Sequence, residues 1–230
     1  MIEIKNLTVE YNGRKILDDI SLTLAKGEKL ALMGENGAGK TTLLHAIKGL
    51  LPSYKGTIAI CGSDIRKDTS VQKKCALLFQ NPDDQIFMPA VYQDIYFGAK
   101  NCFENEEEAE KKTEEAIKKY GLDGLRSRSV YELSGGEKRS LTLAGAMVTE
   151  PECLLLDEPF TYLDMRAKRH LIKELLQMKN SMLLVTHDIS DATALCTRAV
   201  IIKNGKIYRE TETKKLTEES EILRELGYTD

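Results

Sequence analysis

The sequence of 230 residues predicts an α/β fold with a mostly parallel core sheet, an antiparallel β part at the N-terminus and an inserted helical subdomain. Three observations lead to this prediction. Short apolar runs typical of buried strands alternate with helix-like segments toward both ends of the chain, which favours a parallel sheet. Asn12-Gly13 follows an alternating run and signals a tight turn. Between about residues 84 and 149 the pattern is mainly helical and interrupts the alternation.

The first part of the chain is expected to supply several strands. The alternating run from Ile2 to Tyr11 carries Glu3 and Lys5 between apolar residues, which excludes a signal peptide. The apolar run Lys29 to Met33 predicts a buried strand, and Lys40 to Lys48 has helical spacing. The other strands expected here are Ser21–Leu24, Gly56–Ile60 and Cys75–Phe79.

Helix signals dominate the middle of the chain, and strands return after it. Glu106 to Lys119 is acidic first and basic last, which suits the helix dipole. Ser134 is expected as a helix N-cap because Glu137 follows three residues later. The later elements expected are strands at Cys153–Leu156, Met182–Thr186, Ala199–Lys203 and Lys206–Tyr208, a helix at about Met165–Lys179, a helix from near Ile189, a hairpin turn at Asn204-Gly205, and a polar, helical tail from Thr211.

No linker rich in Gly, Ser or Pro divides the chain, so residues 1–230 are expected to form a single domain. Its core covers about residues 1–83 and 150–210, its helical subdomain about 84–149, and its polar tail 211–230.

Composition narrows the function classes. Hydrophobic residues make up 42% and charged residues 30% of the chain, as in soluble globular proteins. The net charge of −3 gives no reason to expect a nucleic-acid partner. The apolar runs are far shorter than the ~20 residues that span a bilayer, so the chain is expected in the cytoplasm. The five cysteines form no CxxC pair and are interpreted as reduced thiols, mostly in the core.

The segment GENGAGKT, from Gly34 to Thr41, follows a predicted strand and opens a predicted helix. Its pattern, G-x-x-x-x-G-K-[ST], is typical of a phosphate-binding loop in a P-loop NTPase core. Glycines let the backbone wrap phosphate oxygens, Lys40 is expected at the β- and γ-phosphates, and the Thr41 hydroxyl is expected on Mg²⁺. The residues expected to bind ATP here are Gly34, Glu35, Asn36, Gly37, Ala38, Gly39, Lys40, Thr41 and Thr42.

A second chemical motif is Asp157-Glu158, two acids directly after the apolar run Leu154 to Leu156. The carboxyl ends of parallel strands form the ligand-binding edge of an open α/β sheet. Asp157 can hold Mg²⁺ through water, and Glu158 can polarise the attacking water. On its own this pattern is also that of a strand ending at a solvated acidic turn.

The sequence LSGGE at Leu133 to Glu137, together with GENGAGKTT, CLLLDEP and a later THD, resembles the ATPase domain of ABC transporters over roughly Ile2 to Tyr208. The resemblance implies that two subunits sandwich two ATP molecules with Mg²⁺. Ser134, Gly135 and Gly136 would contact the γ-phosphate held by the opposite subunit.

Four more roles follow from the same resemblance. Gln80 would reach Mg²⁺ and the attacking water, and His187 would bind the γ-phosphate. Asp164 would bridge the dimer. Tyr11 would stack on adenine, although an ordinary surface tyrosine is the alternative. The sequence departs from the family's usual pattern at Thr161-Tyr162 and at Ser140.

The segments FQNPDDQIF and QDIYFG most resemble the cobalt/nickel and energy-coupling factor group, whose ATPases power uptake of transition-metal ions or vitamins. That resemblance implies an integral membrane partner and a peripheral position at the cytoplasmic face of the membrane. Large apolar residues from Ile86 to Phe97 either pack the helical lobe or form a groove for a helix of that partner.

Two other function classes remain as alternatives. One is a non-transport ABC ATPase acting in DNA repair or translation, although the long heptad segments or tandem domains typical of those proteins are absent from the sequence. The other is a P-loop kinase or phosphotransferase, which LSGGE and THD disfavour.

Overall fold

The computed structural model describes residues 1–217. Its backbone forms two compact units that are each assembled from separate stretches of the chain. The first unit contains Met1–Leu77, Glu152–Glu158 and the chain from Ile172 onward, and the second contains Leu78–Pro151 and Pro159–Leu171. Residues 78–83, 150–151 and 159–171, which were expected in the core, lie in the second unit.

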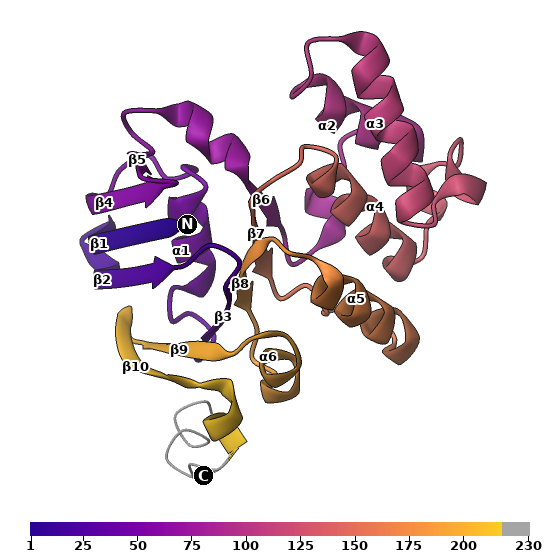
Figure 1. Cartoon of the computed structure of the whole chain (residues 1–230). Helices are drawn as coiled ribbons and strands as arrows, with labels where there is room; N and C mark the ends of the chain where they lie inside the picture. Colours follow the sequence, from indigo (N-terminus) through magenta and orange to yellow (C-terminus); the bar gives the residue numbers. More distant parts are fainter. Residues whose placement is uncertain (218–230) are drawn as a thin grey trace. The chain divides into compact units, whose positions relative to one another are not determined.

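The first unit opens with an antiparallel sheet in the order β2-β1-β4-β5 (Figure 1). Its strands are β1 (Ile2–Tyr11), β2 (Arg14–Leu24), β4 (Lys55–Ile60) and β5 (Ser63–Asp64). Asn12 and Gly13 both have positive φ, at 50° and 76°, as a two-residue hairpin turn requires. β2 therefore starts directly after the turn, and the expected strand at Ser21–Leu24 was too short. Its alternation is hidden in the sequence because the pairing with β1 contains register shifts.

The core sheet of the first unit has six strands in the order β10-β9-β3-β8-β7-β6. They are β3 (Lys29–Met33), β6 (Cys75–Leu78), β7 (Cys153–Asp157), β8 (Ser181–Val185), β9 (Arg198–Lys203) and β10 (Lys206–Glu212). β3 pairs in parallel with β8 and β9, and β7 with β8, whereas β9 and β10 form an antiparallel hairpin. Every residue of β7 and β8 is buried, which explains their continuous apolar sequences. The predicted fold class is confirmed.

Two α-helices, α1 (Lys40–Ile47) and α6 (Ile189–Leu195), and the short 3-10 turns η1 (Thr69–Lys74) and η5 (Thr213–Thr217) belong to the first unit. The expectation of a helical tail from Thr211 was wrong at its start, because Thr211 and Glu212 pair with β9 as the end of β10. Residues 218–230 of the predicted tail lie outside the described residues.

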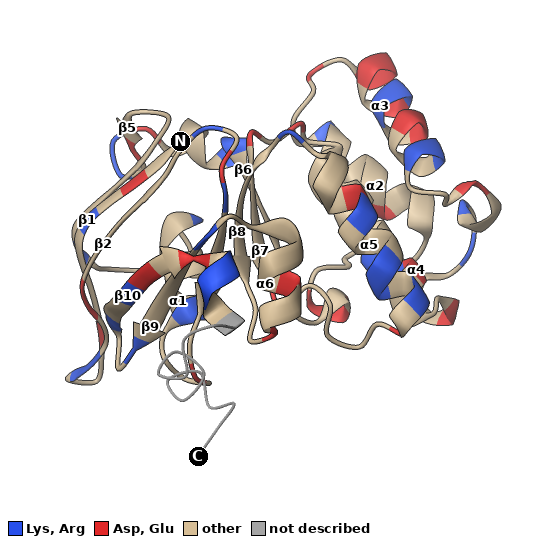
Figure 2. Ribbon diagram, turned by 60° about the horizontal axis from the view of Figure 1, so that its bottom comes forward, with Lys and Arg blue, Asp and Glu red and all other residues tan. Residues whose placement is uncertain are grey.

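The second unit is helical, with α2 (Val91–Lys100), α3 (Glu106–Lys119) and α4 (Gly135–Met147) gathered together (Figure 1). Short 3-10 turns occur at η2 (Pro82–Asp84), η3 (Asp123–Leu125) and η4 (Val130–Glu132), and α5 (Met165–Gln177) begins in this unit. Asn105 caps α3, whose first turn is acidic and last turn basic, as predicted (Figure 2). Ser134 caps α4 through a capping box with Glu137, which confirms the predicted helix start.

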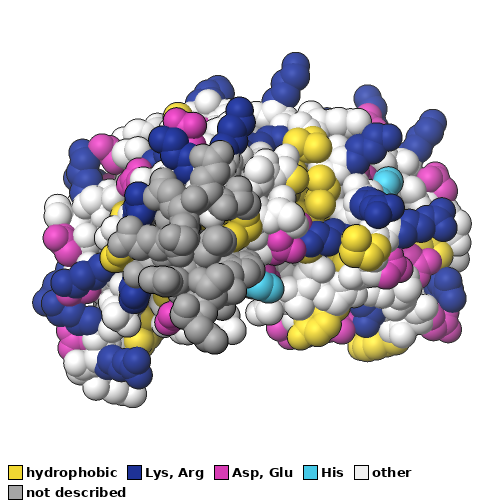
Figure 3. Space-filling model, turned by 90° about the horizontal axis from the view of Figure 1, so that it is seen from below, with side chains coloured by type: hydrophobic (Ala, Val, Ile, Leu, Met, Phe, Trp, Pro, Cys, Tyr) yellow, Lys and Arg dark blue, Asp and Glu magenta, His cyan; other side chains and the backbone are white. Residues whose placement is uncertain are grey.

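The surface carries charges of both signs. On the face seen in Figure 3, Lys and Arg side chains are interspersed with Asp and Glu and with small apolar clusters. Among residues 1–217, no helix combines the length and the apolar character that crossing a bilayer requires.

Candidate nucleotide-binding and hydrolysis site

The loop between β3 and α1 has a backbone that only glycine adopts without strain at three positions. Gly34, Gly37 and Gly39 have φ of 140°, 80° and 105°. A Cβ at Gly34 would lie 2.1 Å from the carbonyl oxygen of Ile202, and one at Gly39 would lie 2.6 Å from the Leu17 side chain. Gly34 therefore packs against β9 and Gly39 against β2, and neither position has room for a side chain.

The N-terminus of α1 is available to an anion. Gly39 is its N-cap and gives no side-chain hydrogen bond, and the first turn contains no acidic residue. The free N–H groups and the helix dipole therefore favour a phosphate at this end. Lys40 is buried, and its ammonium donates hydrogen bonds to the carbonyls of Gly34 (2.7 Å) and Glu35 (2.9 Å). Burial lowers the pKa of Lys40, which Glu158 and Asp157 oppose by their negative charge.

Asp157 and Thr41 meet at the carboxyl edge of the core sheet. Asp157 is the last residue of β7 and is buried, and Thr41 lies in the first turn of α1. The Thr41 hydroxyl donates a hydrogen bond of 2.7 Å to Oδ2 of Asp157. This pair supplies a neutral and an anionic oxygen beside the lysine, the donor set that suits a hard cation such as Mg²⁺.

Glu158 follows directly and faces His187. The Glu158 backbone has φ of 44°, a strained conformation for a residue with a side chain. Its N–H donates to the carbonyl of Val185 at 3.0 Å, which anchors the turn to β8. Both carboxylate oxygens lie 3.0 Å from Nδ1 of His187, two residues beyond the end of β8. The Glu158 side chain is 14% exposed and that of His187 is 70% exposed, so an acid and an imidazole meet at the rim of the site.

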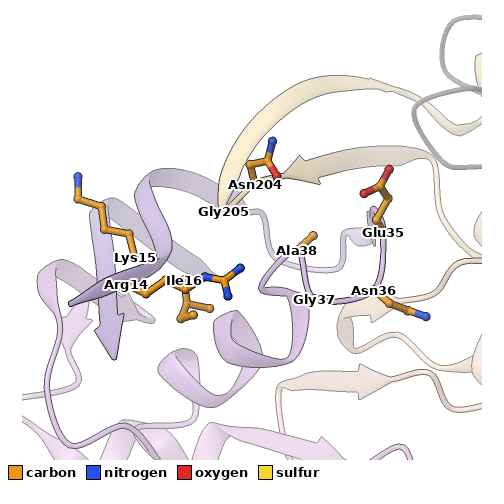
Figure 4. Close-up of a pocket in the computed structure, with 9 residues that line it drawn as sticks. All are labelled: Arg14, Lys15, Ile16, Glu35, Asn36, Gly37, Ala38, Asn204 and Gly205. Carbon is orange, nitrogen blue, oxygen red and sulfur yellow. The ribbon is translucent and has the colours of Figure 1, made fainter. Parts of the chain in front are cut away.

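A pocket of about 320 Å³ opens beside the loop (Figure 4). It is lined by Arg14, Lys15, Ile16, Glu35, Asn36, Gly37, Ala38, Asn204 and Gly205. The Arg14 side chain extends toward the turn at Gly37, whereas Lys15 points away from it. The volume is within the usual range for small-molecule sites, and the lining includes the Arg14 side chain beside the glycine-rich loop. Arg14, Lys15 and Ile16 were not singled out from the sequence, and Asn204 and Gly205 were predicted only as a hairpin turn.

Several sequence-predicted residues lie elsewhere. Tyr11 ends β1, is 43% exposed and does not line the pocket. Gln80 is exposed and belongs to the second unit, as do Ser134, Gly135, Gly136 and Asp164. The predicted loop residues, in contrast, do lie at the site: Glu35, Asn36 and Ala38 line the pocket, Thr41 bonds Asp157, and Thr42 lies inside the first turn of α1.

The predicted signature residues begin α4. The Ser134 hydroxyl accepts from the N–H of Glu137 and donates to its carboxylate at 2.7 Å. A Cβ at Gly135 would lie 3.2 Å from the carbonyl oxygen of Tyr162. Asp164 accepts hydrogen bonds from the N–H groups of Arg166 and Ala167, both at 2.8 Å, and so caps α5. The helix start and the segment before α5 are therefore packed together within the second unit.

Comparisons with known proteins identify the family of the chain. The family model described as ABC transporter matches residues 17–161. A putative ABC transporter ATP-binding protein of Brucella suis is 41% identical over 210 residues, which cover 90% of this chain and 87% of the relative. The energy-coupling factor transporter ATP-binding protein EcfA2 of Clostridium tetani is 36% identical over an alignment of 241 residues. The alignment covers 98% of this chain and 84% of that protein.

Solved structures show the same fold. CbiO1 of Clostridium perfringens, described as part of the ABC transporter complex CbiONQ, matches with a TM-score of 0.85 and 30% identity. The match covers 98% of this chain and 94% of CbiO1. The ATP-binding cassette MJ0796, in a dimeric state bound to ADP and Pi, matches with a TM-score of 0.82 at 24% identity, and supports the fold alone.

The chain belongs to the ABC transporter family and is an ATP-hydrolysing subunit of that class. The relatives EcfA2 and CbiO1 assign it, within the family, to the energy-coupling factor and cobalt importer group of ATPases. The resemblance drawn from the sequence motifs is thus confirmed.

Proposed function

We propose that this chain binds Mg²⁺-ATP in a sandwich of two ATPase subunits and drives import of a transition-metal ion or a vitamin through a separate integral membrane subunit. It would act at the cytoplasmic face of the membrane. The observation that carries the proposal is the cluster of Lys40, Thr41, Asp157, Glu158 and His187 at one edge of the core sheet. The similarity to EcfA2 and CbiO1 supports the transport role.

Thr41 and Asp157 are the residues proposed to hold Mg²⁺. They already share one hydrogen bond of 2.7 Å, so both oxygens face the same point. Mg²⁺ keeps several waters and takes few protein ligands, which fits a site of one hydroxyl and one carboxylate beside phosphate oxygens. When bound, the ion neutralises charge on the β- and γ-phosphates. Gln80 is proposed as a further ligand.

Glu158 is proposed to accept a proton from the water that attacks the γ-phosphorus, while the bond to the ADP oxygen breaks. The Glu158 backbone is bonded to Val185, which limits the positions open to the carboxylate when the water binds. His187 is proposed to leave Glu158 for a γ-phosphate oxygen. Lys40 would exchange its two backbone carbonyl partners for phosphate oxygens, a stronger charge-assisted contact.

The second subunit is proposed to complete each site with the start of its own α4. Ser134, Gly135 and Gly136 offer a hydroxyl and amide groups at a helix N-terminus, which suit a γ-phosphate. The Ser134 hydroxyl would turn from Glu137 toward that phosphate. Asp164 is proposed at the contact between subunits, and Tyr11, which is 43% exposed, is proposed to stack on adenine.

The membrane subunit is proposed to place a helix on the exposed apolar residues around α2. Phe87 is 72% exposed and Phe97 42% exposed, with ring centroids 6.2 Å apart, whereas Val91 and Ile95 are fully buried. Buried Asp94 accepts from the N–H groups of Phe87 (2.8 Å) and Met88 (3.0 Å), which fixes the segment that carries Phe87. An exposed aromatic pair on a fixed segment suits the apolar face of a partner helix. Val91 and Ile95 thus pack inside the second unit, whereas Phe87 and Phe97 remain exposed to a partner.

The test of the catalytic assignment is Glu158→Gln. Losing a positioned base lowers a rate by typically 10²–10⁴. We expect hydrolysis to fall by that factor while ATP still binds and holds the chains as a dimer in size-exclusion chromatography. Glu152→Gln is the matched control, because Glu152 precedes the opposite end of β7 and pairs with Lys74 at 3.2 Å. Hydrolysis by Glu158→Gln within a few-fold of the control would remove the assignment.

A further inference from the structure

Arg139, in the second turn of α4, is buried with only 2% of its surface exposed. Its guanidinium donates to two successive backbone carbonyls, from Nη1 to Phe79 (2.8 Å) and from Nη2 to Gln80 (2.6 Å). Within the described residues its Nε has no hydrogen-bond partner, and no carboxylate forms an ion pair with it. Burial alone lowers the pKa of Arg139 to about 10, so the group stays charged at neutral pH.

A buried cation without an anion is costly, and an apolar side chain of similar size would avoid the cost. The advantage of arginine at this position is the fixed geometry of its hydrogen bonds. Its planar guanidinium holds two adjacent carbonyls in one fixed geometry, whereas an ammonium binds carbonyls through rotatable donors and an apolar side chain cannot bind them at all. The two carbonyls lie just beyond the end of β6, at the residue proposed to contact Mg²⁺ and at its neighbour.

Two more contacts attach the same segment. Lys138 donates to Oδ1 of Asp83 at 2.6 Å, with the Lys138 side chain 19% exposed. The Gln85 side chain accepts from the N–H of Phe79 at 3.2 Å, which closes residues 79–85 into a compact loop. Two consecutive residues of α4 therefore bind this loop, Arg139 at its start and Lys138 at Asp83, and all of these residues lie in the second unit.

Ser134 lies on the same helix, five residues before Arg139. At about 1.5 Å per residue the two are separated by roughly 7.5 Å along the axis. The Gln80 carbonyl and the N-cap at Ser134 are therefore both attached to α4.

We propose that Arg139 is a positioning residue that ties Gln80 of one ATP site to Ser134 of the other, and so couples the two sites of the dimer. The inference rests on the proposed two-subunit function. ATP contacted by Gln80 in its own subunit moves α4, and α4 carries the residues that close on the opposite ATP. Arg139 touches neither nucleotide, and its effect appears as cooperativity and turnover, with nucleotide affinity unchanged.

The test compares Arg139→Met and Arg139→Lys with Lys111→Met, which removes an exposed charge from α3. The rate of ATP hydrolysis is measured against ATP concentration, and binding of a fluorescent ADP to the isolated chain is measured by titration. We expect Arg139→Met to lower kcat at least tenfold and to bring the Hill coefficient to about 1. ADP affinity should stay within twofold of wild type, because the loop around Lys40 belongs to the first unit.

Arg139→Lys should recover part of both losses, since its ammonium keeps the charge and can donate to backbone carbonyls, but without the fixed planar geometry of the guanidinium. It also provides a second variant if Arg139→Met does not fold. Wild-type kcat and Hill coefficient in the folded variants would overturn the proposal. So would a kcat loss that comes with an equal loss of ADP affinity, which indicates general structural damage. If wild type hydrolyses ATP without cooperativity, the coupling is overturned while the assignment of the hydrolysis site stands. If wild type does not hydrolyse ATP at all, the proposed function fails with it.

Discussion

Replacing Gly34 by Ala tests how the phosphate loop is fixed to the core sheet. Gly34 has φ of 140°, and a Cβ there would lie 2.1 Å from the carbonyl oxygen of Ile202, the residue after Ile201, which pairs with Met33. Gly37 is the matched control, because it has φ of 80° in the same loop but no atom within 4 Å of its Cβ position.

The two substitutions share one cost and differ in another. Any residue with a Cβ at positive φ loses about 1–2 kcal/mol. Gly34→Ala must in addition move the loop away from β9, and overpacking of this kind costs about 1–3 kcal/mol. The expected loss of unfolding free energy is therefore about 1–2 kcal/mol for Gly37→Ala and about 2–5 kcal/mol for Gly34→Ala.

Urea unfolding followed by far-UV circular dichroism, without nucleotide, measures the difference. A gap of about 2 kcal/mol corresponds to roughly 4–8 °C in Tm for a protein of this size. If both variants lose the same free energy within about 0.5 kcal/mol, then the approach to Ile202 is relieved without cost. The core sheet would then not be the reason why position 34 requires glycine.

Three further predictions concern the proposed activity. Lys40→Ala should weaken ATP binding, measured by calorimetry, because each charge-assisted bond to phosphate is worth about 1.5–3 kcal/mol; unchanged affinity contradicts the role of the loop. A mixture of Ser134→Arg and Lys40→Ala chains should recover part of the ATPase activity that each lacks, since one heterodimer site then has an intact lysine and an intact helix start. No recovery at any mixing ratio argues for sites closed within one chain. Phe87→Asp, whose side chain is 72% exposed, should abolish co-purification with membrane subunits while the isolated chain keeps most of its ATPase activity. Val91→Asp is the contrasting variant, because that side chain is fully buried and the change should destabilise the lobe itself. A Phe87→Asp protein that still retains its membrane subunit would put the docking surface elsewhere.

Local chemistry explains why part of the fold was predictable. The two hairpin turns follow from Asn12-Gly13 and Asn204-Gly205, whose positive φ angles few other residue pairs accept. The start of α4 follows from Ser134 and Glu137, because a capping box needs only residues three apart. β2 was missed over its first half, since its pairing with β1 shifts register and no simple alternation survives in the sequence.

The sequence by itself determined the phosphate loop, the acidic strand end and the family, because each depends on residue types at short, fixed spacing. Only the tertiary structure decided which of these residues meet. Thr41 bonds Asp157 across 116 residues, and His187 faces Glu158 across 29, because parallel strands bring their carboxyl ends to one edge of the sheet. The hydrogen bond from Arg139 to Gln80 joins residues 59 positions apart, and neither residue spacing nor composition predicts it. An arginine in a helix is ordinarily a surface residue. Arg139 is buried because α4 packs against residues 79–85, whose carbonyls it binds.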